Sequence, residues 1–418
     1  MRKYISSALK ILTKVFSDGT YSNIAFYGES VSEMTTRLVY GVLEQNVKLE
    51  YIIDSLTSRK PQNKLYILLK IGAYALLYLD DVPDFAIVSE CVEVAKADGK
   101  GGASGFVNAI LKNIAKGQYV LPDETAKNYL SVTYSKPQWF VDKLISQYGL
   151  QTAKQIISEQ PTGLEHIRIN RRLSSFEEVA SQIEKSQMPY RASETGGIIT
   201  RVSDVTRKLF EEGKITIQSP SSMLAVEALG ARDGANILDL CSAPGGKAVY
   251  LSELCPNSAI TACDIHKHRI GLIQKYKQRM HAPNIKAVIN DASVFNSEWE
   301  NAFDFVLADV PCSCFGTFTK HADVFLSRGE KDIAAIAQTQ LKIAKNAVRY
   351  LKKGGVMVYS TCTLFKEEND DIVAKLIGEC DLSLDKIATP LYPDNDGSIQ
   401  VLPHGEWDGF YIARLIKN

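Results

Sequence analysis

Cysteines follow two of the expected β-strands, at the point where each strand ends. Cys312 and Cys314 follow the stretch 303–308, and Cys362 follows the stretch 356–360. The carboxyl ends of parallel strands meet at one edge of a sheet, where open α/β sheets bind their ligands. An isolated free cysteine is most often a small buried apolar residue, but a thiolate at such an edge could act as a covalent nucleophile. By chemistry alone, either Cys312 or Cys362 could attack a substrate.

The spacing of these cysteines does not indicate a metal site. Cys312 and Cys314 form a Cys-x-Cys pair with no histidine or second pair nearby, and none of the 8 cysteines belongs to a Cys-x-x-Cys pair. A metal site or a redox pair is therefore the less favoured interpretation, and we predict no metal. Dispersed cysteines also favour a reducing compartment, so we expect a cytoplasmic protein.

A glycine turn between a strand and a helix is the second chemical feature. The stretch 235–240 predicts a buried strand, and the segment after it contains Pro244, Gly245 and Gly246. Small residues at such a turn let a nucleotide-type cofactor approach the backbone. The Gly-x-Gly-x-x-Gly and P-loop spacings are absent, which argues against dinucleotide and nucleoside triphosphate sites. The alternative is a plain turn from a strand into a helix.

Three aspartates follow the next expected strands. Asp264 lies about twenty residues beyond the glycine turn, where open α/β sheets place an acid on ribose hydroxyls. Taken alone, it could equally be a solvated residue at a strand end. Asp291 follows the third strand, where it could contact a ligand or cap a helix before Ala292. Asp309 ends the fourth strand, three residues before Cys312.

The elements that would position these residues fall into three predicted domains. Helical periodicity interrupted by breakers runs through 1–120, and helices mixed with short strands such as 167–170 occupy 121–213. Over 214–418 strands alternate with helices, which is typical of a parallel sheet covered on both faces. We therefore expect an all-helical domain, a small α+β linker domain and a doubly wound, Rossmann-like α/β domain. The clearest helix is expected over 331–351, and the expected strands of the last domain are 235–240, 259–263, 285–289, 303–308 and 356–360.

Composition excludes several classes of protein. The 418 residues are 45% hydrophobic and 23% charged, which is ordinary for a globular protein and unlike a disordered chain. The apolar stretch 71–79 is too short to cross a bilayer, and the amino terminus lacks the continuous apolar core of a signal peptide. We expect no membrane partner. The formal net charge is zero, so a nucleic acid would have to be held by local patches. Basic clusters, usually just solvated faces, occur at Arg168, Arg171 and Arg172 and at Lys267, His268 and Arg269.

The motifs around the glycine turn and the cysteines resemble those of the S-adenosylmethionine-dependent RNA cytosine-C5 methyltransferases. The upstream segments 76–83 and 105–111 are similar to the antitermination factor NusB. Together the two resemblances cover nearly the whole chain and are typical of bacterial 16S ribosomal RNA methyltransferases of the Sun/Fmu (RsmB) type. The catalytic likeness is carried by Asp239–Lys247, Asp309–Ser313, Tyr359–Cys362, Glu367–Asn369 and Asp408–Tyr411.

The resemblance implies different catalytic roles for Cys312 and Cys362. Carbon 5 of cytosine is a weak nucleophile, so its methylation needs a covalent partner at carbon 6 that pushes electrons toward carbon 5. A thiolate suits that role. The resemblance assigns the attack to Cys362 and assistance in the departure of the thiolate to Cys312. It places Asp309 at the boundary between the target base and the cofactor.

The resemblance also implies S-adenosyl-L-methionine as the cofactor. Its methionine end is expected against 241–247, its ribose on Asp264 and its adenine near Asp291. The residues expected to bind it are Cys241, Ser242, Ala243, Pro244, Gly245, Gly246, Lys247, Asp264, Arg269, Asp291 and Asp309.

The implied partner is 16S ribosomal RNA, naked or in an early small-subunit particle, bound by a monomer. Its target cytosine would have to be unstacked. Several positions depart from the family's pattern. Cys314 replaces a glycine, and Thr319–Leu326 replaces an arginine-rich stretch expected beside the substrate, while Ser242 and Ala248 are milder changes around the glycine turn. Three other functions remain open, and the first is methylation of an RNA other than 16S ribosomal RNA. Methylation of another acceptor would need no cysteine, and a non-catalytic RNA-binding assembly factor would need no intact site.

Overall fold

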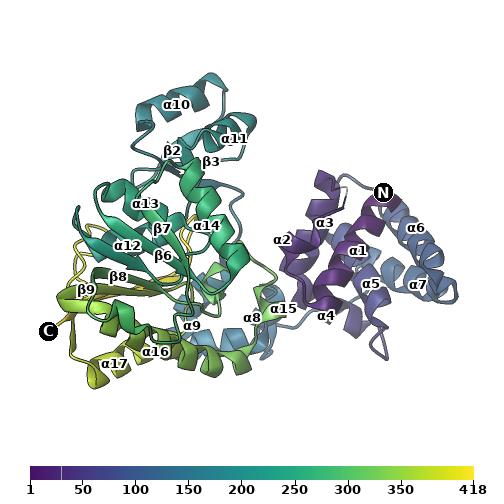
Figure 1. The fold of residues 1–418 in the computed structure, drawn as a ribbon. Helices are drawn as coiled ribbons and strands as arrows, with labels where there is room; N and C mark the ends of the chain where they lie inside the picture. The colour runs from purple at the N-terminus through teal and green to yellow at the C-terminus, as the bar shows by residue number, and fades with distance from the viewer. Residues whose placement is uncertain (30) are drawn as a thin grey trace. The chain divides into compact units, whose positions relative to one another are not determined.

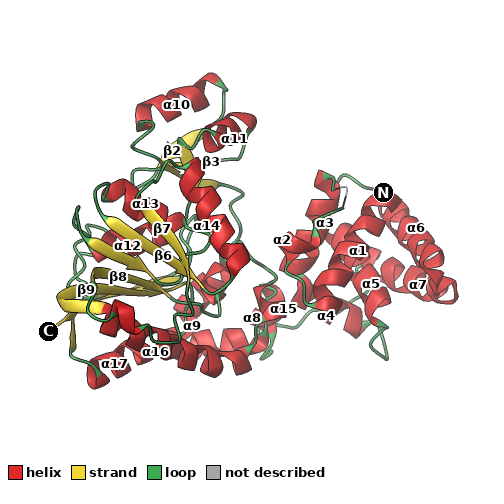
Figure 2. Cartoon of the chain, in the orientation of Figure 1, coloured by secondary structure: helices red, strands yellow, loops and turns green. Residues whose placement is uncertain are grey.

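The chain folds into two compact units, one helical and one built around two sheets (Figures 1 and 2). The computed structural model describes residues 1–29 and 31–418. The predicted division into three domains stays a prediction. The first unit contains Met1–Ser158 and His321–Glu330, and the second contains Glu159–Lys320 and Lys331–Asn418.

The helical unit is held together by apolar stripes that recur at helical spacing. In α1 (Arg2–Asp18), for example, Ile5, Leu9 and Leu12 are buried in the core of the unit. Helix α1 ends at Gly19, whose φ of 66° closes the helix with a left-handed residue. The other helices of residues 1–120 are α2 (Ser22–Ala25), α3 (Glu33–Glu44), α4 (Asn46–Ser55), α5 (Asn63–Tyr78), α6 (Asp84–Ala95) and α7 (Ser104–Ala115).

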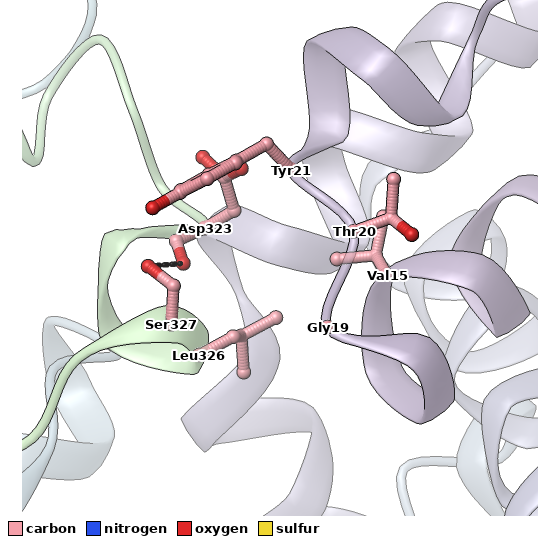
Figure 3. A pocket seen from close by; sticks show the side chains of 7 residues that line it. All are labelled: Val15, Gly19, Thr20, Tyr21, Asp323, Leu326 and Ser327. Carbon is pink, nitrogen blue, oxygen red and sulfur yellow. Dashed lines mark hydrogen bonds between the residues drawn. The ribbon is translucent and has the colours of Figure 1, made fainter. Parts of the chain in front are cut away.

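Three further helices also belong to this unit. They are α8 (Tyr129–Thr133), α9 (Gln138–Ser158) and α15 (Val324–Ser327). Phe325 of α15 packs edge-on against Phe140 of α9, with ring centroids 4.9 Å apart. Leu326 of α15 and Tyr21 of the turn after α1 line a small pocket (Figure 3). The segment that follows the Cys312 loop in sequence is thus built into the helical unit.

The smaller sheet of the second unit is antiparallel, with strand order β2-β3-β1-β4. It packs against two amphipathic helices in a small core of its own. The predicted strand at 167–170 is confirmed as β1. The elements are β1 (Glu165–Ile169), α10 (Phe176–Lys185), β2 (Tyr190–Ala192), β3 (Ile198–Thr200), α11 (Asp204–Glu211) and β4 (Ile215–Ile217).

The larger sheet has strand order β10-β12-β9-β8-β5-β6-β7, with β11 paired to β12. Strands β9, β8, β5, β6 and β7 run parallel, and β12 joins the sheet antiparallel to β9. The strands are β5 (Asn236–Asp239), β6 (Ala259–Asp264), β7 (Ile285–Ile289), β8 (Phe303–Asp309), β9 (Leu351–Thr361), β10 (Leu382–Leu384), β11 (Ser398–Val401) and β12 (Phe410–Lys417).

Helices cover both faces of this sheet (Figure 1). Successive strand residues point to opposite faces, so Ile237 packs in one core and Leu238 in the other. The first core holds α12 (Pro220–Leu229), α13 (Gly246–Leu254) and α14 (Lys267–Arg279), and the second holds α16 (Ile333–Tyr350) and α17 (Asp370–Glu379). The predicted doubly wound α/β class is confirmed, preceded by the predicted helical region.

The five predicted parallel strands and the predicted long helix at 331–351 are all present. The three antiparallel strands at the carboxyl terminus were not predicted. Over 382–417 the strands pair with one another and with β9, a long-range arrangement that leaves no strand-helix alternation to detect. Among the described residues, none of the helices combines the length and the apolar character needed to cross a membrane.

Candidate active site

The predicted glycine turn connects β5 to α13 at the carboxyl edge of the large sheet. Gly245 has a φ of 112°, a conformation that favours glycine. A Cβ atom at this position would lie 3.3 Å from the Cα atom of Ile273 in α14. Glycine therefore lets the turn pack tightly on α14.

Unpaired polar atoms mark this turn as a place built for a polar ligand. Among the described residues, both carboxylate oxygens of Asp239, the hydroxyl of Ser242 and the amide nitrogen of Asn290 are buried without a hydrogen-bond partner. Burial raises the pKa of Asp239 to about 7. Unsatisfied buried groups cost free energy unless a ligand or water pairs with them. The residues present at this edge thus fit a cofactor with several hydrogen-bonding groups.

The structure brings Asp264 and Arg269 to the same edge. The Oδ1 atom of Asp264 accepts a hydrogen bond from the backbone nitrogen of His266 at 2.9 Å, and Oδ2 pairs with the guanidinium of Arg269 at 3.1 Å. Arg269 also donates to the carbonyl of Ala243 in the glycine turn, at 3.4 Å. Arg269 therefore links the predicted ribose-binding acid to the predicted methionine-binding turn.

Asp291 follows β7, as predicted, but its side chain is used locally. Its Oδ1 atom accepts hydrogen bonds from the backbone nitrogen of Ser293 at 2.9 Å and from the hydroxyl of Ser293 at 2.7 Å. No helix begins at Ala292 in the described chain, so the alternative role as a helix cap is wrong. Asp291 instead closes a turn beside the edge of the sheet.

An ion pair joins the glycine turn to the strand that carries the cysteine loop. The Nζ atom of Lys247 lies 2.6 Å from Oδ2 of Asp309, and the hydroxyl of Ser360 donates to Oδ1 of Asp309 at 2.8 Å. Burial opposes the charge on Lys247, but the carboxylate of Asp309 outweighs it and raises the lysine pKa. Asp309, at the end of β8, is thereby held by residues of α13 and β9.

Cys312 and Cys362 meet at this edge as predicted. Strands β8 and β9 are parallel neighbours that align Asp309 with Ser360, so the loops after them start side by side. The sulfur atoms of Cys312 and Cys362 lie 3.2 Å apart, and the sulfur of Cys314 lies 3.9 Å from that of Cys312. Cys312 is 9% exposed, while Cys314 and Cys362 are half-buried. Two thiols therefore lie next to each other at this edge of the sheet.

Both of these thiols are harder to ionise than a free cysteine. Hydrogen bonds to Cys314 and Cys362, together with burial, raise the pKa of Cys312 well above its ordinary value. The hydrogen bond with Cys312 favours the thiolate of Cys362, but contact with Cys314 and burial outweigh it, so the pKa of Cys362 is also raised. Each cysteine therefore rests as a thiol and must lose its proton to act as a nucleophile.

A buried carboxylate holds the two cysteine loops together. Glu368 accepts hydrogen bonds from the backbone nitrogen of Ser313 at 2.9 Å, from Gln340 at 3.0 Å and from Thr363 at 3.3 Å. Asn369 donates to the carbonyl of Thr363 at 3.2 Å. Ser313 follows Cys312 and Thr363 follows Cys362, so these contacts fix the backbone beside both sulfurs.

Sequence reasoning did not name Asp239, Ser360 or Glu368 as site residues. Asp239 could have been found, because a carboxylate at the end of an otherwise apolar strand is unusual. Glu368 entered only within a motif that carried the family resemblance. Its contact with Ser313 spans 55 residues and depends on the tertiary fold.

Two positions that depart from the family's pattern have clear structural settings. Cys314 adopts a φ of 63°, which explains why glycine suits this position. Within Thr319–Leu326, Lys320 pairs with Asp408 at 2.8 Å, and Asp323 accepts a hydrogen bond from the backbone nitrogen of Ser22 at 2.8 Å.

One residue of the predicted basic cluster, Arg168, is buried in the interior. Arg168 is 2% exposed, and it pairs with Glu253, donates to Gln218 at 2.7 Å and lies over the ring of Tyr250. Because its guanidinium is buried and paired, Arg168 cannot bind a phosphate. It is also not part of a solvated surface. Arg168 joins the small sheet to α13 instead.

The fold and the site together define a methyltransferase of the doubly wound class, and comparison with known proteins identifies the family. The family model described as "16S rRNA methyltransferase RsmB/F" matches residues 226–416, and the NusB family model matches residues 6–116. The chain is 31% identical to the probable ribosomal RNA small subunit methyltransferase B of Bacillus subtilis (strain 168), with 98% of each chain covered. It is 31% identical to ribosomal RNA small subunit methyltransferase B of Yersinia enterocolitica, covering 99% of this chain and 98% of that one.

The chain therefore belongs to the RsmB/F methyltransferase family and carries a NusB-type region at its amino terminus. A solved structure of the protein PH0851 has the same fold, with a TM-score of 0.85 and 23% identity over 99% of this chain and 98% of that chain. The resemblance found in the sequence is confirmed at both ends of the chain.

Proposed function

We propose that this protein transfers a methyl group from S-adenosyl-L-methionine to carbon 5 of one cytosine in 16S ribosomal RNA. The observation that carries this proposal is the 3.2 Å separation of the Cys312 and Cys362 sulfurs beside a cofactor-type glycine turn. Methyl transfer to an oxygen or a nitrogen needs no thiol, whereas carbon 5 of cytosine needs a nucleophile at carbon 6. Two adjacent thiols at this edge favour the cytosine reaction.

The cofactor would be held by the glycine turn and by the acids that follow β6 and β7. The segment 241–247 would surround its methionine end, Asp264 with Arg269 would bind its ribose, and Asp291 would lie near its adenine. The unpaired atoms of Asp239 and Ser242 supply hydrogen-bonding capacity for the same ligand. When bound, S-adenosylmethionine supplies an electrophilic methyl group.

Cys362 would act first, in the role that the family resemblance gives it. After losing its proton, its thiolate forms a bond to carbon 6 of the cytosine, and the electron pair of the 5,6 double bond moves to carbon 5. Carbon 5 would then take the methyl group, and the electron pair of the broken carbon–sulfur bond would remain on the cofactor's sulfur, which leaves as a neutral thioether. A base removes the proton from carbon 5, the double bond forms again, and the bond between carbon 6 and sulfur breaks to return the thiolate.

Cys312 would assist the departure of Cys362. Its sulfur is hydrogen-bonded to that of Cys362, so a proton can be shared between the two while the bond to carbon 6 breaks. Asp309, fixed by Lys247 and Ser360, would contact the target base at the cofactor boundary. Glu368 would be a positioning residue, since it holds the loops and touches neither sulfur in its hydrogen bonds.

The substrate assignment comes from the relatives, which are named as methyltransferases of the small ribosomal subunit. The target cytosine would leave its stack to reach the edge of the sheet. Naked 16S ribosomal RNA or an early small-subunit particle would be bound by a monomer in the cytoplasm.

The test is to incubate the protein with S-adenosylmethionine and unmodified 16S ribosomal RNA and to map 5-methylcytosine by bisulfite sequencing. One new methylated cytosine is expected. Cys362→Ala should lose it while still binding S-adenosylmethionine in equilibrium dialysis. Cys312→Ala should accumulate a covalent adduct with the RNA, seen as a band of reduced mobility in a denaturing gel.

Cys380→Ala is the matched control, because Cys380 lies away from the site, directly after α17. This variant should retain full activity. Methylation by Cys362→Ala would refute the assigned nucleophile. Absence of 5-methylcytosine on both naked RNA and immature small subunits would refute the assignment of 16S ribosomal RNA as the substrate.

A further inference from the structure

A third thiol completes a cluster at the candidate active site. The sulfur atoms of Cys312, Cys314 and Cys362 all lie within 4.8 Å of one another. Within the part of the chain that the structure describes, they are the only group of three or more potential metal ligands this close together. The sequence analysis placed these cysteines at one edge of the sheet but predicted no metal site, because sequence spacing could not show that the three sulfurs lie this close together.

The cluster is held in place by the surrounding backbone. The backbone nitrogen of Gly316 donates to the carbonyl of Cys362 at 2.9 Å, which ties the loop after β8 to the loop after β9. Glu368 binds Ser313, the residue between Cys312 and Cys314. A site whose ligands are already positioned loses little freedom on binding an ion.

Cys314 has no part in the proposed methyl transfer, yet its backbone is strained. A φ of 63° favours glycine, and a cysteine adopts this conformation only where its surroundings hold it there. That conformation keeps the Cys314 sulfur 3.9 Å from Cys312. The unfavourable backbone conformation thus occurs at Cys314, the residue that adds the third sulfur to the cluster.

We propose that Cys312, Cys314 and Cys362 bind a thiophilic d¹⁰ cation, with Zn²⁺ as the physiological representative and Cd²⁺ as a spectroscopic probe. Tetrahedral Zn²⁺ with bonds of about 2.3 Å to sulfur places two thiolates about 3.8 Å apart. The separations of 3.2 and 3.9 Å bracket that value. Three protein ligands leave one coordination position for water, as in open zinc sites.

Binding would convert three thiols to thiolates and release three protons to water, leaving a site with one net negative charge for a divalent ion. A thiolate coordinated to the cation is unavailable for attack on carbon 6. The cation would therefore inhibit methyl transfer reversibly, a consequence that rests on the proposed function. The binding itself does not depend on it.

The test is a titration of the reduced full-length protein with Cd²⁺, following the ultraviolet charge-transfer band between thiolate and metal. One equivalent is expected to bind. Cys314→Gly removes one ligand and suits the backbone, so it should fold and should bind Cd²⁺ at least about tenfold more weakly. Cys380→Ser is the control and should bind like the unchanged protein. Equal affinity in Cys314→Gly, or absence of the band, would overturn the proposal.

Methyl transfer provides the second readout. Zn²⁺ should inhibit the unchanged protein and chelation should restore its activity. Cys314→Gly should resist inhibition at the same Zn²⁺ concentration, with each protein compared with its own rate in the absence of Zn²⁺. Equal inhibition of both proteins would also overturn the proposal. The Cd²⁺ band is read without RNA or cofactor, so a protein that binds Cd²⁺ but methylates no RNA would refute the proposed function and leave the metal site supported.

Discussion

Glu368 accepts hydrogen bonds from both the backbone nitrogen and the hydroxyl of Ser313, at 2.9 and 2.5 Å, across 55 residues of sequence. Ser313 stands between Cys312 and Cys314, so one buried carboxylate sets the conformation of the loop that carries two of the three sulfurs.

Glu368→Gln should weaken both folding and catalysis. A glutamine places an N–H group where the carboxylate accepts hydrogen bonds from Ser313, Gln340 and Thr363, so a buried donor loses its partner. We expect the free energy of unfolding to fall by about 1–3 kcal/mol. The rate of methyl transfer should fall while S-adenosylmethionine affinity stays unchanged, measured by single-turnover kinetics and calorimetry. Glu367→Gln is the neighbouring control, and equal losses in both variants would contradict the role of Glu368.

Asp239 should make the protein less stable as the pH rises toward neutrality. Burial raises its pKa from 3.8 to about 7. Between about pH 4 and pH 7 the folded state keeps a proton that the unfolded state has lost, so the free energy of unfolding decreases across this window. Asp239→Asn should remove this decrease and be more stable at pH 8 by up to about 4 kcal/mol, at about 1.4 kcal/mol per pKa unit. The two proteins should converge near pH 4 in urea denaturation.

Asp304→Asn is a control in which the pKa shift of the replaced carboxyl group has the opposite sign. Burial opposes ionisation of Asp304, but hydrogen bonds from Lys352 and from the backbone of Asn236 outweigh it and lower the pKa. Its stabilisation is present above the unfolded pKa and is lost at low pH, so Asp304→Asn should be less stable than the unchanged protein at pH 8. A gain in stability for both variants would contradict the assigned pKa shifts.

Arg168→Met should be strongly destabilising. Arg168 and Glu253 form a buried ion pair, and burial already raises the pKa of Glu253 above its usual value. Removing one partner leaves an uncompensated buried charge, at a cost of about 3–5 kcal/mol. The double variant Arg168→Met, Glu253→Leu should recover most of this loss. The exposed pair of Arg207 and Asp204 provides a control in which Arg207→Ala has little effect. A double variant no more stable than Arg168→Met would argue against the ion-pair explanation.

Asp323→Ala should loosen the contact between α15 and the turn before α2 (Figure 3). The Asp323 side chain accepts a hydrogen bond from the backbone nitrogen of Ser22, and both residues are buried. Leaving that N–H without its acceptor costs about 1–3 kcal/mol locally. Hydrogen exchange at the Ser22 amide should accelerate in Asp323→Ala and much less in Asp323→Asn, which keeps a side-chain oxygen. Unchanged exchange in Asp323→Ala would show that the contact does not protect this amide.

Much of the fold followed from local sequence. Alternating strands and helices predicted the doubly wound domain, because each parallel strand needs a crossover helix that leaves its own apolar periodicity. The glycine turn and the strand-end positions of Asp264, Asp309 and Cys362 were equally local features. The antiparallel strands over 382–417 were missed, since their pairing is decided by partners elsewhere in the sheet.

The sequence by itself determined which residues with chemistry lie at strand ends, and therefore the class of fold and the edge of the sheet where they gather. Only the tertiary structure decided which of them touch. The sulfur of Cys362 meets Cys312 because β8 and β9 align in register, and Arg168 is buried because Glu253 faces it from another element. Register between distant strands and the burial of individual charges depend on packing of the whole chain, which local spacing does not contain.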